Sequence, residues 1–504
     1  MFAFWAFSVP DFGSFRMRQF ENMILLHLNK DLYENDIRAL LMAFFYGEKI
    51  SLSAQEWSKQ LFVYYGKGSL EAVIEDKEGR TVRLSSDFVE DDYKKGRNQV
   101  KKTVYGVLSE YTGKKLPWGT LTGIRPTKLA MEMMEKSRTD KEIISYLTET
   151  YLASEGKAEL CFEVAQNEKR ILDGIDFENS YSLYAGVPFC PSICAYCSFS
   201  SYPVDKWKDQ TDAYTDALIK EIRAASAMLA GKKPVTFYMG GGTPTSLSAY
   251  QLDRILSSIR GSFDLEGVRE MTVEAGRPDS IDRDKLKVLK THGVDRISIN
   301  PQTMNQQTLD IIGRRHTVED VKNAFKMARE EGFENINMDL IIGLAGERKE
   351  HMIRTMEAVT ALSPDNITIH SLALKRAAYL NHNREKFPVA EPSEIWKMSD
   401  TGREYAIRSG MEPYYLYRQK NIAGNLENVG YAKRGKEGLY NILIMEEKQT
   451  ILALGTGASS KFVLKGKESG RIERIENVKS VKDYIERTDE MIGRKQTFIL
   501  QHEV

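Results

Sequence analysis

Three of the four cysteines fall within the stretch Cys190-Pro-Ser-Ile-Cys194-Ala-Tyr-Cys197, directly after the strand-like run 181–187. Three thiolates on one loop cannot complete a tetrahedral zinc site without a fourth ligand. Their soft sulfur atoms are the usual anchors of iron–sulfur clusters. The spacing therefore predicts a metal cluster, and it suits a four-iron cluster in which one iron stays open to another ligand.

Two alternative interpretations of the cysteines are weaker. A structural zinc site would need a second group of ligands, but Cys161 lies in an expected helix over 158–171 and the seven histidines are scattered. A disulfide framework would need more than four cysteines in 504 residues. The pattern favours an iron–sulfur site over a zinc site and leaves Cys161 as an ordinary buried thiol.

The composition limits the class of protein. With 42% hydrophobic and 28% charged residues it is typical of a globular chain, and no segment approaches the roughly twenty apolar residues of a membrane span. The 71 basic and 71 acidic residues balance, so no net field would attract nucleic acid or an acidic membrane. We expect a multi-domain, cytoplasmic protein with no nucleic-acid partner and no membrane insertion.

Four segments are expected along the chain. Residues 1–22 are apolar but lack a positively charged leader, so they form an uncertain N-terminal extension rather than a signal peptide. Residues 23–175 form an N-terminal α+β module with a docking linker. Within the module, the patterns predict strands over 24–28, 59–65, 70–75 and 80–85 and helices over 34–45 and 93–112. A barrel over 176–384 and a mixed C-terminal substrate or cap domain over 385–504 complete the chain.

The barrel prediction rests on a strand and helix pattern that repeats six times between residues 181 and 372. The strands are expected over 183–187, 235–239, 270–275, 296–300, 336–342 and 366–372. The helices are expected over 211–230, 249–260, 282–291, 305–312 with 318–331, and 349–362. This alternation predicts a parallel α/β sheet, and its repeats suit an open, partial (β/α)6 barrel better than a closed one.

Unusual residues follow these strands, at the rim where barrel active sites are built. The glycines of Gly240-Gly-Gly-Thr-Pro-Thr245 let backbone amides approach a carboxylate or phosphate, although a tight turn would explain them equally. Glu274, Gln302 and Asp339 end or follow the next strands, and several polar groups on one rim indicate a functional site. Further on, Pro413-Tyr-Tyr-Leu-Tyr-Arg-Gln419 either stacks on a planar ring and pairs with its carboxylates or packs as an edge strand.

With these residues the chain resembles the radical S-adenosylmethionine enzymes of the oxygen-independent coproporphyrinogen III oxidase group, and within it the HemZ-type branch. The likeness rests on Tyr184-Ala-Gly-Val-Pro-Phe-Cys190, the Cys-x3-Cys-x2-Cys spacing, the loop over 240–245 and the motifs over 272–278, 296–302 and 337–344. Segments 118–128 and 414–431 also match that branch. The resemblance thus covers nearly the whole chain after residue 23.

The resemblance implies a role for each matching residue. Cys190, Cys194 and Cys197 would hold a 4Fe-4S cluster, whose open iron binds the methionyl amine and carboxylate of S-adenosylmethionine. The implied contacts to this cofactor are Tyr184, Tyr196, Gly240, Gly241, Gly242, Thr243, Glu274, Gln302, Arg314, Asp339 and Ala373. Of these, Tyr184, Glu274 and Arg314 are implied to be catalytic. Asp339 can accept the ribose hydroxyls, and Glu274 with Arg314 complements the charges of the methionyl end.

The resemblance also implies a reaction. In this group the reduced cluster splits S-adenosylmethionine into methionine and a 5′-deoxyadenosyl radical, which takes a hydrogen atom from a propionate side chain. Carbon dioxide leaves and a vinyl group remains, and repetition on a second propionate turns coproporphyrinogen III into protoporphyrinogen IX. The expected partners are therefore a porphyrinogen or haem and a low-potential electron donor of the flavodoxin or ferredoxin type.

Two positions depart from the pattern of the oxidases. A histidine that usually precedes the cysteine loop is Gly186 here, and the Gly-Leu-Pro-Gly turn is Gly343-Leu-Ala-Gly346. A haem chaperone of the same group keeps the cluster motif yet delivers haem. The sequence therefore predicts a coproporphyrinogen-decarboxylating enzyme, with a haem-binding transfer protein as the alternative and a radical enzyme of another substrate as a third possibility.

Overall fold

The computed structural model describes residues 23–123, 125–373, 390–419 and 422–504. The chain forms two compact units, one of Met1–Thr122 with Ser145–Lys157 and one of Gly123–Ile144 with Ala158–Val504. The expected extension over 1–22 lies outside the described residues. The finer domain boundaries expected at residues 175 and 384 stay predictions.

The first unit is a five-stranded sheet, in the order β2-β1-β3-β4-β5, covered by two helices. Its elements are β1 (Met23–Leu28), α1 (Glu34–Phe44), β2 (Lys49–Ser51), β3 (Lys59–Tyr65), β4 (Ser69–Asp76), β5 (Thr81–Asp87) and α2 (Tyr93–Thr112). Leu61, Val63 and Tyr65 alternate inward from β3 into an apolar core shared with α1 and α2, as a half-buried strand requires. The predicted elements of this module are confirmed, and only the short β2 had no sequence signal.

The second unit contains six consecutive parallel strands, which confirms the predicted partial barrel. They are β6 (Ser180–Val187), β9 (Lys233–Gly241), β10 (Glu270–Glu274), β11 (Arg296–Ser298), β12 (Ile336–Ile342) and β13 (Asn366–Ser371). Each strand pairs with the next along the chain. The carboxyl ends of all six therefore meet at one edge, where the cysteine loop begins.

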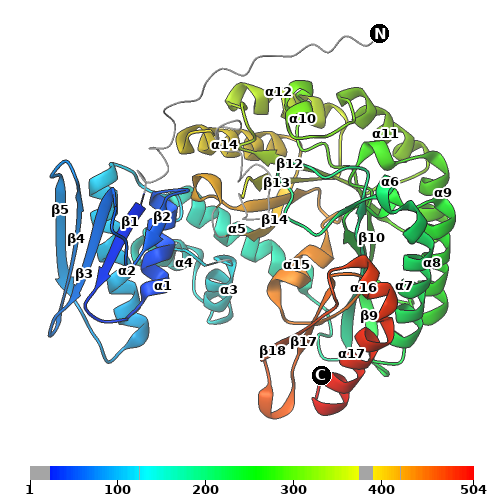
Figure 1. Ribbon diagram of the computed structural model, residues 1–504, viewed down its shortest axis with the longest axis horizontal. Helices are drawn as coiled ribbons and strands as arrows, with labels where there is room; N and C mark the ends of the chain where they lie inside the picture. Colours follow the sequence, from blue (N-terminus) through cyan, green and yellow to red (C-terminus); the bar gives the residue numbers. More distant parts are fainter. Residues whose placement is uncertain (1–22, 124, 374–389, 420–421) are drawn as a thin grey trace, which may run out of the picture. The chain divides into compact units, whose positions relative to one another are not determined.

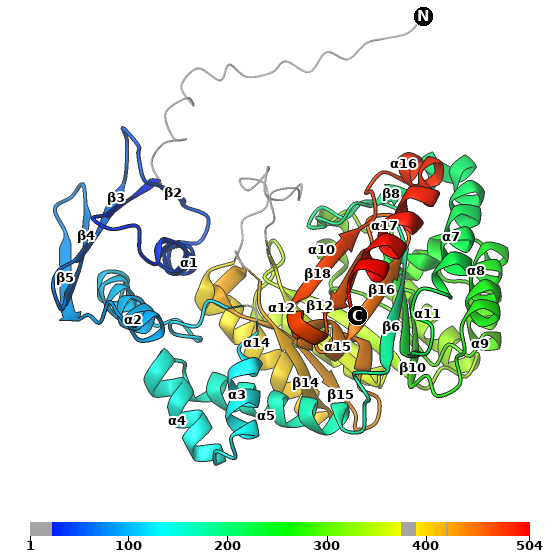
Figure 2. The ribbon, with the colours of Figure 1, turned by 90° about the horizontal axis from the view of Figure 1, so that it is seen from below.

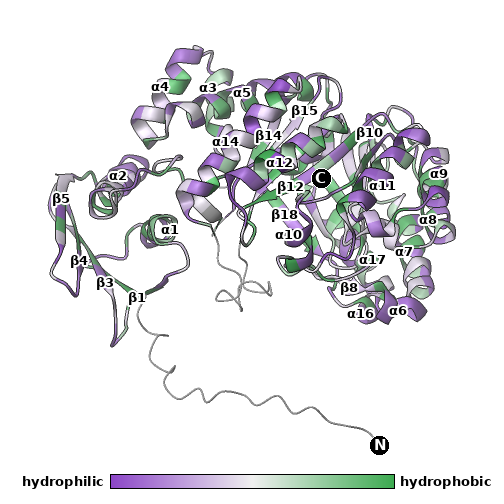
Figure 3. Cartoon of the chain, turned by 90° about the horizontal axis from the view of Figure 1, so that it is seen from above, coloured by the Kyte–Doolittle hydropathy of each residue, from purple (hydrophilic) through white to green (hydrophobic). Residues whose placement is uncertain are grey.

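Helices cover the outer face of these strands, and Figure 1 shows α7, α8, α9 and α11 following one another outside β9 and β10. They are α7 (Thr211–Ala225), α8 (Ala249–Ser262), α9 (Arg283–Thr291), α10 (Gln306–Ile311), α11 (Val318–Glu330), α12 (Lys349–Ala361) and α14 (Pro392–Arg408). Helix α8 starts at a capping box in which Ser248 and Gln251 bond each other's backbone N–H. Its Leu252, Ile255, Leu256 and Ile259 form the buried stripe. Figure 3 shows hydrophilic and hydrophobic residues side by side along α7, α8 and α11.

The C-terminal segment extends the same sheet on both sides, which the strand pattern had not indicated. Strand β16 (Thr450–Leu454) pairs parallel with β6, and β17 (Ser459–Val463) and β18 (Ile472–Glu476) continue antiparallel from it. At the other end β15 (Asn428–Ala432) pairs antiparallel with β13, and β14 (Glu412–Tyr417) with β15. The complete sheet has eleven strands.

A buried ion pair fastens the C-terminal helices to the barrel. Helices α16 (Val481–Glu486) and α17 (Thr488–Gln501) lie against α7 (Figure 2). Lys495 Nζ of α17 lies 2.7 Å from Glu221 Oε1 of α7, and both side chains are completely buried. Asn477, the Tyr484 hydroxyl and the backbone N–H of Gly455 donate further hydrogen bonds to Glu221. With these bonds made, the charges remain compensated away from water.

The remaining elements connect these parts. They are α3 (Thr127–Glu135), α4 (Asp140–Tyr151), α5 (Glu155–Leu172), β7 (Phe189–Cys190), β8 (Tyr202–Pro203), α6 (Val204–Trp207) and α15 (Leu439–Glu446). Cys161 is fully buried in α5, and burial raises the pKa of its thiol well above the ordinary value. Among the described residues, no helix combines the length and apolar character that a membrane crossing needs.

Candidate active site

The cysteine loop is closed at its neck and tied to a neighbouring loop. Strands β7 and β8 pair at the neck, where the Tyr202 N–H donates to the Pro188 carbonyl at 2.9 Å. The Ala195 N–H donates to the Ile312 carbonyl at 3.0 Å, just after α10. All four cysteines are free thiols. The loop is therefore held at its neck and at its middle by backbone contacts, and none of its sulfur atoms is in a disulfide.

Cys190, Cys194 and Cys197 line one cavity of about 350 Å³, which we call the cofactor cavity. Most of the predicted cofactor contacts line it too: Tyr196, Gly241, Gly242, Thr243, Glu274, Gln302, Arg314, Asp339 and Ala373. Two do not. Tyr184 lines the adjoining cavity instead, and Gly240 is in the lining of neither.

Close packing, rather than exposed amides, explains two of the three glycines after β9. A Cβ at Gly242 would lie 2.6 Å from the Phe189 carbonyl oxygen and 3.0 Å from Cys190 Sγ. A Cβ at Gly240 would lie 2.8 Å from the Tyr238 ring and 3.0 Å from the Glu274 carboxyl. The N–H groups of Gly242 and Thr243 donate to carbonyls beside the cysteine loop, each at 2.7 Å. These two amides therefore fix the loop and do not face a ligand, in contrast to the sequence expectation.

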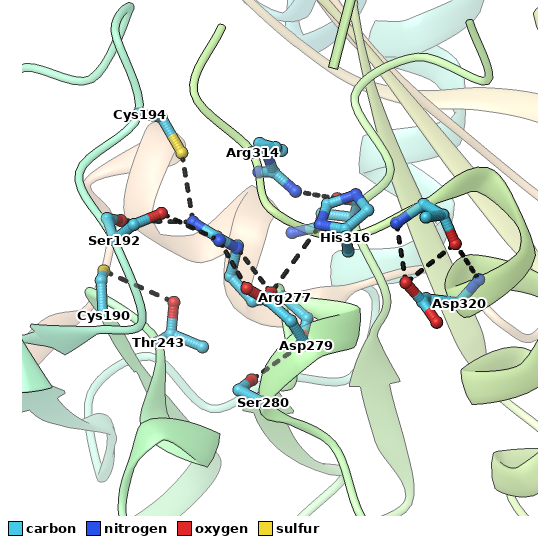
Figure 4. Close-up of polar contacts among 12 residues, drawn as sticks. Cys190, Ser192, Cys194, Thr243, Arg277, Asp279, Ser280, Arg314, His316 and Asp320 are labelled. Carbon is cyan, nitrogen blue, oxygen red and sulfur yellow. Dashed lines mark hydrogen bonds and ion pairs between the residues drawn. The ribbon is translucent and has the colours of Figure 1, made fainter. Parts of the chain in front are cut away.

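Polar donors contact the sulfur atoms of Cys190 and Cys194 (Figure 4). The Thr243 hydroxyl lies 3.5 Å from Cys190 Sγ, and Arg277 Nη1 lies 3.5 Å from Cys194 Sγ. Burial raises the pKa of the Cys190 thiol to about 11, and the Thr243 hydrogen bond partly offsets this effect. Metal binding replaces the thiol proton and so overcomes this cost.

The donor set fits an iron–sulfur cluster. Within the described ranges, no three His, Cys, Asp or Glu side chains converge as ligands of one metal ion. A four-iron cluster needs no such convergence, because each thiolate binds its own iron. Three uncommitted thiols on the wall of one cavity, with N–H and O–H donors to their sulfur atoms, suit such a cluster.

Charged groups of both signs face the cofactor cavity. Burial raises the pKa of Glu274 to about 7, although its carboxylate accepts a 2.5 Å hydrogen bond from the Tyr238 hydroxyl. Arg314 donates to the Tyr196 hydroxyl at 2.9 Å and to the Asn300 carbonyl. Burial alone would raise the pKa of Asp339, but the nearby His370 lowers it below its usual range. The cavity can thus bind a ligand that carries both an ammonium and a carboxylate group.

A second, larger cavity of about 660 Å³ adjoins the first, and we call it the tyrosine cavity. Five tyrosines line it: Tyr184, Tyr238, Tyr415, Tyr417 and Tyr440. The register of β6 and β9 sets Tyr184 opposite Tyr238, with ring centroids 6.2 Å apart, and Tyr440 of α15 stacks 4.5 Å from Tyr238. Arg296, Lys461 and Lys479 add positive charge to the lining. The cavity therefore combines aromatic surfaces with groups that bind carboxylates.

The two cavities meet along a shared wall. It consists of Ser198, Phe199, Gly241, Gly242, Glu274, Asp339, His370 and Tyr417. His370, near the end of β13, has a side chain 27% exposed, with Nε2 3.7 Å from Asp339 Oδ2 and Nδ1 3.4 Å from the Tyr417 hydroxyl. The imidazole of His370 therefore lies on the wall that the two cavities share.

The aromatic segment over 413–419 forms the edge strand β14, and two of its tyrosines line the tyrosine cavity. Tyr415 and Tyr417 line the tyrosine cavity, whereas Tyr414 is buried in an apolar cluster with α15. Arg418 is buried and donates to the Asn425 side chain and the Leu426 carbonyl, so it does not line either cavity. The structure thus places two of the tyrosines on a cavity wall, whereas the arginine supports the fold.

Gly186, which departs from the sequence pattern of the oxidases, is closely packed. A Cβ at this position would lie 3.3 Å from the Tyr184 ring and 3.4 Å from the Leu454 carbonyl oxygen. Strand β16 brings that carbonyl close because it pairs with β6. A Cβ at this position would therefore lie in tight contact with the Tyr184 ring and at van der Waals distance from the added strand β16.

Four residues of the site were not singled out from the sequence. Arg277 and Tyr238 lie in or beside motifs already identified, and His370 follows the same rim rule as Asp339, so position after a strand was an available signal. Tyr440 lies far from any motif, on a C-terminal helix, and no local pattern marks it.

Comparisons with known proteins show the family and the fold of the chain. The family model of the radical SAM superfamily matches residues 184–359. The chain is 39% identical to the oxygen-independent coproporphyrinogen-III oxidase-like protein HemZ of Bacillus subtilis strain 168, over 84% of this chain and 85% of that one. It is 32% identical to the heme chaperone HemW of the same organism, over 60% of this chain and 75% of that one. The coproporphyrinogen III oxidase HemN of Escherichia coli shares the fold with a TM-score of 0.51, at 23% identity over 65% of this chain and 73% of that one.

Proposed function

Because the chain belongs to the radical SAM superfamily, and within it to the family of the oxidase-like protein HemZ, we propose that it decarboxylates coproporphyrinogen III to protoporphyrinogen IX without oxygen. Members of this superfamily use a 4Fe-4S cluster and S-adenosylmethionine. When bound, the two supply a 5′-deoxyadenosyl radical that takes a hydrogen atom from the substrate. An electron donor of the flavodoxin or ferredoxin type is part of the proposal. The four free thiols suit the reducing, cytoplasmic setting expected from the sequence.

The assignment of residues to the cofactors follows the lining of the cofactor cavity. Cys190, Cys194 and Cys197 hold the cluster. Glu274 accepts the ammonium of S-adenosylmethionine and Arg314 its carboxylate, since both charges face the same cavity as the cysteines. The remaining polar residues of that cavity orient the nucleoside, with Asp339 as the acceptor for its ribose hydroxyls.

The observation that carries the substrate assignment is the tyrosine cavity beside the cofactor cavity. Its volume of about 660 Å³ lies in the range of ligand sites, and its aromatic lining offers flat surfaces to pyrrole rings. Arg296, Lys461 and Lys479 can pair with acidic side chains of such a substrate. The residues common to both linings show that the two cavities adjoin, so substrate in one would lie beside the cofactor in the other.

The test is turnover under anaerobic conditions. Reconstituted protein is incubated with dithionite, S-adenosylmethionine and coproporphyrinogen III, and the porphyrins are separated after oxidation. We expect protoporphyrin, together with carbon dioxide and methionine in amounts that rise in proportion to it. Release of methionine without any decarboxylated porphyrin would contradict the proposal. The Cys194→Ala variant, which cannot complete the cluster, is the matched negative control.

Haem binding is the second candidate, and one observation favours it. His370 and Tyr417 are both side chains that bind haem iron in other proteins, and they lie 3.4 Å apart on the lining of the tyrosine cavity. One relative is named as a heme chaperone. Haem that stays bound through gel filtration, in an amount equal to that of the protein and with no turnover of coproporphyrinogen, would support this function over the first.

A further inference from the structure

Arg277 points from the end of β10 back towards the cysteine loop (Figure 4). Its side chain is only 3% exposed. Nη1 lies 3.2 Å from the Ser192 carbonyl oxygen and 3.5 Å from Cys194 Sγ, and Nη2 lies 3.1 Å from the Ser192 hydroxyl. One edge of the guanidinium group is therefore directed at the loop that carries the cysteines.

Another edge of the same guanidinium group is held by a carboxylate. Asp279 accepts two hydrogen bonds from Arg277, from Nε at 2.8 Å and from Nη2 at 2.7 Å. His316, which is buried, lies 3.7 Å from the same carboxylate. A two-point contact of this kind fixes the plane of a guanidinium as well as its position. The orientation of Arg277 is therefore set by the protein without any help from a ligand.

The charges in this group of residues are settled by burial and by their contacts. Burial alone would raise the pKa of Asp279, but the nearby His316 and the hydrogen bonds from Arg277 lower it below its usual range. Burial lowers the pKa of His316, so its imidazole is neutral near pH 7. The arginine stays charged at any accessible pH. A permanent positive charge thus faces Cys194, with one compensating negative charge on its far side.

We propose that Arg277 raises the reduction potential of the cluster through its contact with Cys194, and that Asp279 positions it. The inference rests on the proposed assignment of Cys194 as a cluster ligand. Reduction adds one electron, taken from dithionite or a low-potential donor protein, and with it one negative charge on the iron–sulfur group. A buried N–H donor and a positive charge beside a ligand sulfur stabilise that added charge. Arg277 therefore makes reduction of the cluster by its electron donor easier, and it does so without touching substrate.

The experiment is a potentiometric titration of the reconstituted cluster followed by electron paramagnetic resonance, without S-adenosylmethionine or porphyrinogen. At the wild-type midpoint, we expect Arg277→Gln to lower the ratio of reduced to oxidised cluster about tenfold, a shift of about 59 mV for a one-electron couple. Arg277→Lys keeps the charge but loses the planar fork, so its midpoint should lie between the two. An unchanged midpoint in Arg277→Gln, at full iron content, would overturn the proposal.

Asp279→Asn gives a prediction of opposite sign. It removes the compensating negative charge but keeps a hydrogen-bond acceptor, so the midpoint should rise. A merely structural role would instead make both variants lose cluster or shift the same way. If Arg277→Gln holds no iron, Asp279→Asn decides the question, and a midpoint that does not rise would overturn the proposal.

Arg329→Gln is the matched control, since Arg329 also pairs with an aspartate, Asp365 at 2.7 Å, at the amino end of β13. Its midpoint should equal that of the wild type. If the cysteine assignment itself fails, the wild type will hold no cluster. If only the substrate assignment fails, the titration is unaffected, because no substrate is present.

Discussion

The cofactor cavity and the tyrosine cavity share a wall but are built in different ways. The first is formed by loops at the carboxyl ends of consecutive strands, and backbone hydrogen bonds tie those loops together. The second is lined by residues of all six barrel strands together with the C-terminal elements β14, α15, β16 and β17. The C-terminal segment therefore contributes much of the tyrosine cavity and little of the cofactor cavity. Four changes separate the two cavities experimentally.

Replacement of a cysteine should have the largest effect, confined to the cofactor side. Cys194→Ala removes one of three thiolates, so we expect loss of the brown chromophore and of all turnover, checked by iron and sulfide content. Cys161→Ala is the matched control, because that thiol is buried in α5 away from the cavity. Full iron content in Cys194→Ala would contradict the assignment.

Glu274→Gln tests the negative charge on the wall that the two cavities share. A hydrogen bond to a charged group contributes about 1.5–3 kcal/mol, so affinity for S-adenosylmethionine should fall roughly tenfold to a hundredfold above pH 7. The pKa of Glu274 is raised to about 7, so in the wild type the carboxylate forms, and this affinity rises, as pH increases through that value. Isothermal titration calorimetry between pH 6 and 8 (about one unit on either side of that pKa) measures both effects.

The raised pKa also predicts a change in stability with a definite sign. A carboxyl group whose pKa is higher in the folded than in the unfolded protein stabilises the fold at low pH. This contribution to the free energy of unfolding is lost as pH rises from the unfolded pKa of about 4.3 to the folded pKa. Glu274→Gln removes this loss, so the variant should unfold at higher temperature than the wild type at pH 8 (about one unit above the folded pKa) but not below pH 4. A pH-independent difference would contradict the buried, proton-binding carboxyl.

His370→Asn tests the shared wall from the substrate side. The imidazole faces both cavities, and we expect kcat/KM for coproporphyrinogen to fall about tenfold, the cost of about one hydrogen bond. Binding of S-adenosylmethionine should change by less than the Glu274 variant shows. Equal losses in cofactor binding would place His370 with the cofactor cavity instead.

The smallest effect is expected in the tyrosine stack. Tyr440→Leu removes a ring that stacks 4.5 Å from Tyr238, and an aromatic pair contributes about 0.5–1.5 kcal/mol. The KM for substrate should therefore rise about two- to tenfold, with iron content and S-adenosylmethionine binding unchanged. Tyr440→Phe keeps the ring and is the control, so a loss as large as that of the leucine variant would assign the effect to the hydroxyl.

The difference between the cavities also explains what the sequence could predict. The six strands, their helices and the cysteine loop follow from local periodicity and spacing, and each was recognisable within one short segment. Tyr440 and the pairing of β16 with β6 depend on contacts between residues far apart in the chain, which no local pattern contains. The glycines after β9 were noticed, but their role in accommodating Cys190 and Glu274 depends on side chains that only the fold brings near.

The pairing of β16 with β6 orders events during synthesis. The cysteine loop and the residues that support it, up to His316, precede the strand that completes the wall of the tyrosine cavity at residues 450–454. Long-range pairing is slow and cannot begin until the later strand has left the ribosome. An emerging chain therefore presents its cysteines before its substrate cavity exists. Until β16 (Thr450–Leu454) has been synthesised, β6 is unpaired along the edge that β16 covers.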